Sequence, residues 1–132
     1  MFDKFKMHGD VSLSWHNKTL EINTTGPWNM EFFEHLHAQL INMVRKQHIT
    51  DFDVLLNIYG EALPIPDAQN FHIEFLKTSS AKAVAINLAQ CDTRSMTKQV
   101  CDNVYPAANL DHKCFNTRKQ ALAWLASKRG KE

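Results

Sequence analysis

The chain has 132 residues, of which 44% are hydrophobic and 22% charged, and this balance predicts one globular domain spanning residues 1–132. Its formal net charge of +1 supplies no strong field to attract nucleic acid or an anionic membrane surface, and we expect neither as a partner. No run approaches the roughly 18 apolar residues that a membrane-spanning helix needs.

Two segments of alternating apolar and polar residues come first, and they predict a β-hairpin. Val11–Trp15 alternates strictly, which is typical of a strand with one buried face. Residues 16–18 supply a turn, where Asn17 tolerates a left-handed backbone, and residues 19–23 alternate again.

A long amphipathic helix follows the Gly26-Pro27 break. Asn29 is placed to cap it through its side-chain oxygen, and the helix is expected to run to about His48. Apolar side chains recur at three- and four-residue steps and predict a buried stripe formed by Phe33, Leu36, Leu40, Met43 and Val44.

The apolar run Phe52–Ile58 predicts a central strand that is covered on both faces, because a half-exposed strand would alternate. Two acids flank its first residue, and we expect Asp51 and Asp53 to be solvated there. A loop containing two prolines then leads to a second helix, with Asp67 as its expected cap. Phe71 and Phe75 are spaced to face inward on this helix, with His72 beside them.

Two further strands and two further helices complete the pattern. Residues 83–86 read as a buried strand, and Asp92 or Thr93 is placed to cap a third helix that should end before Pro106. Residues 112–115 read as a short outer strand. Thr117 and Gln120 form a capping-box pattern at the last helix, whose expected inner residues are Ala121, Leu122 and Leu125.

The resulting order is β-β-α-β-α-β-α-β-α. Strands that alternate with helices predict an α/β fold with a mostly parallel sheet of about five strands, and the N-terminal hairpin adds an antiparallel margin. The basic end of the chain, which holds Lys128, Arg129 and Lys131, is expected to be a solvated terminus.

Gly26-Pro27-Trp28-Asn29 at the start of the long helix and Gln120-Ala121-Leu122-Ala123-Trp124-Leu125 near the end, in this element order, resemble the bacterial STAS-like (SpoIIAA-like) domain family. The resemblance implies helices packed on a five-stranded sheet and a non-enzymatic role. Anti-sigma-factor antagonists of the wider group bind a kinase-like partner, and the similar CRAL-TRIO domains carry an apolar ligand.

One feature of the antagonists is missing from this sequence. They switch through phosphorylation of a Ser at the start of the helix that follows the central strand, whereas residues 59–70 contain neither Ser nor Thr. A phosphate switch needs an aliphatic hydroxyl to modify, so we do not expect that mechanism here.

Metal and thiol chemistry are both disfavoured by the residue pattern. His35 and His37 are two apart on a helix and point in different directions, and no H-E-x-x-H motif is present, so no metal or other cofactor is expected. Cys91 precedes a helix start but lacks the Arg of a phosphatase loop, and we expect a buried, unreactive thiol. The odd number of cysteines and the absence of a signal-peptide core favour a cytoplasmic protein.

The remaining candidate is a binding surface where the central strand ends. Its expected residues are Trp28, Asn29, Tyr59, Glu61, Leu63, Ile65 and His72. The alternative is that Trp28 and Leu63 only close the core. We therefore expect a regulatory or protein-interaction module with an unknown partner, or else a carrier of a small apolar or lipidic ligand. A thiol enzyme using Cys91 is the least favoured alternative, and a homodimer is left open because a sheet edge needs covering.

Overall fold

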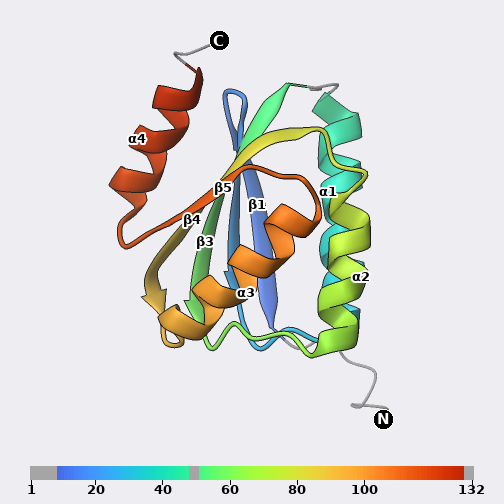
Figure 1. The fold of residues 1–132 in the computed structure, drawn as a ribbon. Coiled ribbons are helices and arrows are strands. Elements are labelled where there is room, and N and C mark those ends of the chain that lie inside the picture. Colours follow the sequence, from blue (N-terminus) through green and yellow to red (C-terminus); the bar gives the residue numbers. More distant parts are fainter. Residues whose placement is uncertain (1–8, 48–50, 130–132) are drawn as a thin grey trace.

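The computed structural model describes residues 9–47 and 51–129, which form one mixed five-stranded sheet with helices on both faces (Figure 1). The elements are, in chain order, β1 (Asp10–His16), β2 (Thr19–Thr25), α1 (Met30–Gln47), β3 (Phe52–Gly60), α2 (Pro66–Leu76), β4 (Ala81–Cys91), α3 (Arg94–Ala107), β5 (His112–Phe115) and α4 (Arg118–Arg129). The strands lie side by side in the order β1-β2-β3-β4-β5; β1 is antiparallel to β2, and the other neighbours are parallel. The predicted element order and mostly parallel sheet are confirmed.

The two faces of the sheet carry different helices. The larger apolar core lies beneath α1, α2 and α3, and the smaller one lies beneath α4, on the opposite side of the sheet in Figure 1. Because successive strand residues point to opposite faces, Val54 and Ile58 belong to the larger core, whereas Leu55 belongs to the smaller one. The prediction that this strand is central and covered on both faces is confirmed.

Two of the predicted helix caps are confirmed. The amide N–H of Phe32 donates to Asn29 Oδ1 at 2.9 Å, so Asn29 caps α1. The N–H of Gln120 donates to Thr117 Oγ1 at 3.1 Å at the start of α4. Ala121 and Leu125 are the buried residues of that helix, and Leu122 is packed against them.

Three expectations about the middle helices are wrong. Asp67 does not cap α2: the helix begins at Pro66, which suits the first helical position, and Asp67 lies in the first turn. Helix α3 continues through Pro106 to Ala107, because a proline in the last turn removes one hydrogen bond without interrupting the turns before it. Phe71 is 38% exposed, because α2 turns Ala68 and Leu76 most deeply inward, whereas Phe75 packs against the larger core as expected.

Thr93 occupies the cap position of α3 without a side-chain capping bond. Its hydroxyl lies 2.9 Å from the hydroxyl of Thr97, a fully buried residue one turn into the helix. Thr97 in turn donates to the carbonyl oxygen of Ala62 at 3.1 Å. This contact ties the loop after β3 to α3.

The basic end of α4 is not a solvated terminus as expected. Arg129 Nε donates to Asp53 Oδ2 at 2.8 Å, and its Nη2 donates to the carbonyl oxygen of Lys18. Asp53 is only 3% exposed, so the expectation that it is solvated is also wrong. Lys128 pairs with Asp111. The charges therefore fasten α4 to the sheet; Lys131 lies outside the described residues.

Candidate functional site: an apolar cavity between the helices and the sheet

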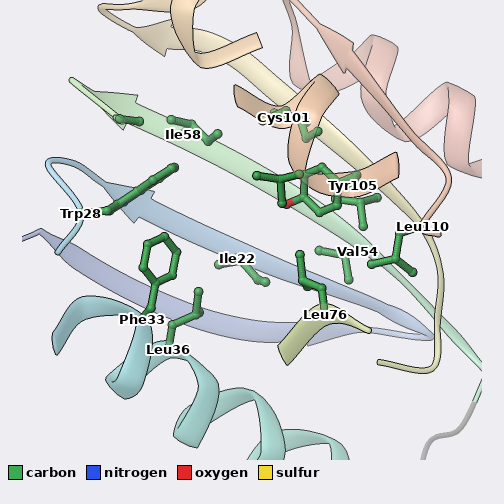
Figure 2. Close-up of a cluster of buried hydrophobic side chains, with 14 of the residues drawn as sticks. Ile22, Trp28, Phe33, Leu36, Val54, Ile58, Leu76, Cys101, Tyr105 and Leu110 are labelled. Atoms are coloured by element: carbon green, nitrogen blue, oxygen red, sulfur yellow. The ribbon is translucent and has the colours of Figure 1, made fainter. Parts of the chain in front are cut away.

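A cavity of about 390 Å³ lies between the larger helical layer and the sheet. Its walls come from α1, α2 and the end of α3, and its floor comes from β2, β3 and β4, with Leu36, Leu40, Leu56, Phe75, Val84 and Tyr105 among the lining residues. Figure 2 shows side chains from these elements, including Ile22, Leu36 and Tyr105, directed toward one another from both layers. The volume falls within the roughly 300–1,000 Å³ typical of ligand pockets.

Four polar lining residues of the cavity gather at one end. Thr78, Ser79 and Ser80 follow α2, and Arg45 lies in the last turn of α1. Arg45 and Ser80 are exposed, so this end meets solvent. Phe52 and Ala81, the first residues of β3 and β4, also line the cavity. The cavity therefore lies toward the amino-terminal ends of the parallel strands.

A smaller pocket of about 50 Å³ adjoins the cavity and shares lining residues with it, among them Ile22, Leu36 and His72. It extends toward the carboxyl end of β3, where Trp28 and Pro64 line it. Trp28 is 8% exposed, and its indole Nε1 donates to Thr24 Oγ1 at 3.0 Å. The indole is thus held by a hydrogen bond at the far end of the apolar space.

Two histidines, of which His72 lines the cavity, join α1 to α2. His37 Nε2 and His72 Nδ1 share a hydrogen bond at 2.8 Å, and the two rings lie edge to edge, with planes 11° apart and centroids 5.1 Å apart. His37 also stacks on Phe75 at 3.8 Å, and His72 stacks on Phe33 at 4.6 Å. Desolvation lowers the pKa of His37 to about 4. Burial, followed by repulsion from His37, lowers the pKa of His72 to about 3, so both rings are neutral at pH 7.

The opposite face of the sheet carries a polar network. Asn57 Nδ2 donates to Glu21 Oε2 at 2.7 Å and to Asn23 Oδ1 at 2.9 Å, while its Oδ1 accepts from Asn87 at 2.9 Å. Arg118 donates to both Glu21 oxygens at 2.9 Å, and this bond lowers the pKa of Glu21 against the opposing effect of burial. Every atom named here has a hydrogen-bond partner within the protein, so we interpret the network as structural.

The structure distributes the predicted site residues over two places. Trp28 and His72 lie together on the smaller pocket, and His72 also lines the main cavity. Tyr59 and Ile65 are 37% and 57% exposed, Glu61 is exposed, and Leu63 is half-buried. Asn29 caps α1. Whether the exposed residues bind anything stays a prediction.

Sequence reasoning missed most of the cavity lining. Leu36 and Leu40 were identified only as members of a helical stripe, and a stripe that packs and one that lines a cavity have the same spacing. The polar mouth formed by Arg45 and residues 78–80 gave no signal, because its parts are separated in the sequence.

The groups considered for other chemistry are placed as follows. Cys91 is 3% exposed, as expected, and its thiol lies 3.4 Å from Thr97 Oγ1. His37 is buried and His35 is exposed, so the two point apart as predicted. Across residues 9–47 and 51–129, no group of three or more His, Cys, Asp or Glu side chains could hold a metal ion. No helix in that part of the chain is long and apolar enough to cross a bilayer.

Comparison with known proteins identifies the fold. No family model matches the chain, and no curated protein matches it. The chain is similar to the crystal structure of an uncharacterised protein of the DUF3478 family, described as having a SpoIIAA-like fold, from Shewanella loihica PV-4. The TM-score is 0.60 at 16% sequence identity, over 91% of this chain and 95% of that chain. The chain therefore has a SpoIIAA-like fold, as the resemblance implied.

Proposed function

We propose that this protein is a non-enzymatic binding protein whose cavity holds a small apolar molecule with a polar or anionic end. The observation that carries the proposal is the cavity of about 390 Å³, whose wall and floor residues are mostly Leu, Ile, Val and Phe. An engineered apolar cavity of roughly 150 Å³ already binds benzene. Space of this size costs stability when empty, because its walls lose dispersion contacts.

The ends of the cavity suggest how such a ligand would lie. The apolar part would occupy the space between α1 and the sheet, and the polar end would remain at the mouth, within reach of Arg45, Ser79 and Ser80. A guanidinium and hydroxyl groups are donors, which suit a carboxylate or phosphate oxygen. A monoalkyl carboxylic acid combines both features.

Calorimetric titration with decanoic acid, alongside native mass spectrometry of protein purified from its host, tests the proposal. Leu40→Trp should fill the cavity and abolish binding. Leu122→Trp makes the same change at a half-buried position of α4, on the other side of the sheet, and should leave binding intact. Equal binding by both variants, or no bound ligand in either experiment, would contradict it.

The polar end is tested separately. Arg45→Ala should weaken decanoic acid binding by about fivefold, since an exposed charge contact is worth about 1 kcal/mol. Binding of decanol, which carries no charge, should be unchanged. A parallel loss for both ligands would mean that Arg45 acts through packing and not through its charge.

A second candidate function is that of a protein-interaction module. It is favoured by one observation: Ile65 is 57% exposed between two prolines, and Tyr59 is 37% exposed at the end of β3. A stiff apolar loop loses little entropy when it is bound. Capture of a partner by wild type and by Tyr59→Ala/Ile65→Asp should then differ, while decanoic acid binding should not.

A further inference from the structure

We propose that the outer edge of β1 pairs with β1 of a second copy, so that two sheets join into one continuous antiparallel sheet across a two-fold axis. β1 is the terminal strand of the sheet (Figure 1), and within residues 9–47 and 51–129 it pairs with β2 alone. Its seven residues contain no Pro or Lys. Those are features by which sheets protect an exposed edge from pairing.

The alternation of backbone hydrogen bonds along β1 and β2 identifies the N–H and C=O groups that point outward from the free edge of β1. The N–H of Asp53 donates to the carbonyl of Lys18 at 3.0 Å, so the even-numbered backbone positions of β2 face β3 and the odd-numbered ones face β1. The partners of those odd-numbered positions are the even-numbered residues of β1. The backbone groups of Val11, Leu13 and Trp15 therefore point outward. In agreement, the N–H of Val11 is bonded to the adjacent Asp10 carboxylate at 2.9 Å.

The sequence of β1, DVSLSWH, is complementary to itself when it is reversed about Leu13. Antiparallel pairing centred on Leu13 sets Val11 against Trp15 of the second copy, and Ser12 against Ser14. The two ends set Asp10 against His16. Each apolar residue meets an apolar one, each hydroxyl meets a hydroxyl, and an acid meets a histidine.

This register also satisfies the backbone. With Leu13 at the two-fold axis, the outward N–H and C=O groups of Val11, Leu13 and Trp15 face their counterparts in hydrogen-bonded pairs. The side chains of these three residues already pack against the larger core, so the apolar face continues from one copy to the next. The matching of side chains across the axis, the unprotected edge and the symmetric register all indicate a second copy as the occupant.

Two variants that differ at one residue test the register. Ser12 and Ser14 are exposed, and Ser14 lies opposite Glu21 within the chain, where a lysine is tolerated. Ser12→Lys/Ser14→Lys would place lysine against lysine across the axis twice, whereas Ser12→Glu/Ser14→Lys would place glutamate against lysine. Sedimentation equilibrium should show a wild-type dimer. The dissociation constant should rise by about tenfold or more in the first variant and stay near the wild-type value in the second.

Amide hydrogen exchange identifies the surface directly. The N–H of Leu13 should exchange slowly in the wild-type dimer and fast in the Ser12→Lys/Ser14→Lys variant. A wild type that stays monomeric at every concentration would overturn the proposal, whether or not its Leu13 amide is protected. So would a dimer of equal strength in both variants, or one whose Leu13 amide exchanges fast. None of these results depends on ligand binding in the cavity.

Discussion

The His37–His72 pair makes a specific prediction about acid stability. A histidine whose pKa is lower in the folded protein than in the unfolded chain binds fewer protons when folded. Its contribution to stability is complete above the unfolded value of 6.5 and is lost as the pH falls toward the folded values of about 4 and about 3. When the pH is lowered from 7.5 to 5, the lowered pKa of each ring should reduce the free energy of unfolding by about 2 kcal/mol, or by about 4 kcal/mol for the pair.

Urea unfolding followed by tryptophan fluorescence, at a series of pH values, measures this loss. The matched control is His37→Phe/His72→Phe, which replaces both partners of the buried hydrogen bond and leaves neither ring nitrogen unpaired. This variant should show little change in unfolding free energy between pH 7.5 and pH 5. Glu21, whose pKa is lowered, adds its own loss only as the pH falls below about 4.5, which is outside the range from pH 7.5 to pH 5 over which the wild type and the double variant are compared.

The reasoning would be refuted by a wild type that keeps its unfolding free energy down to pH 5. It would also be refuted if the double variant lost as much as the wild type, because other groups would then carry the effect. A loss of about half, in either single variant, would show that the two rings titrate independently and not as a pair.

Three further predictions concern stability, each checked by urea unfolding against wild type. Asn57→Ala removes an amide with three side-chain partners at a residue only 2% exposed, and should lower the unfolding free energy by about 2–3 kcal/mol. Thr97→Val leaves the carbonyl of Ala62 without its hydroxyl donor and should cost about 1–3 kcal/mol, with Thr97→Ser costing less. At Gly26 a Cβ would lie 1.8 Å from a carbonyl oxygen, so Gly26→Ala should prevent folding. At Gly60 φ is positive but a Cβ would make only an ordinary contact with Thr25 Cγ2 at 3.5 Å, so Gly60→Ala should cost about 1–2 kcal/mol.

The sequence was informative where the signal is local. The alternation in Val11–Trp15 and the capping oxygens of Asn29 and Thr117 depend on residues within a few positions, and each gave the correct element. Asp67 misled because two start signals compete at that helix, and Pro66 at the first helical position takes precedence over a cap one residue later.

The candidate site could not be predicted in the same way. His37 and His72 lie 35 residues apart, and their pairing depends on how α1 sits against α2. The volume of the cavity depends on the same spacing, which a stripe of leucines leaves undetermined. Arg129 and Asp53 lie 76 residues apart, so nothing in the local sequence indicates that they form an ion pair. Taken one at a time, each charged side chain is predicted to be exposed to solvent.

The two faces of the sheet differ in their polar and apolar side chains. The asparagines of β2, β3 and β4 form a row of side-chain bonds across three parallel strands. A slip of one residue would turn this row into the apolar face, at the cost of several unpaired polar groups, so the row fixes the register of the central strands. Because the asparagine row on the α4 side fixes the strand register, the fold can be unique even where the packing beneath α1 and α2 is incomplete. A cavity can therefore exist there without admitting competing strand pairings.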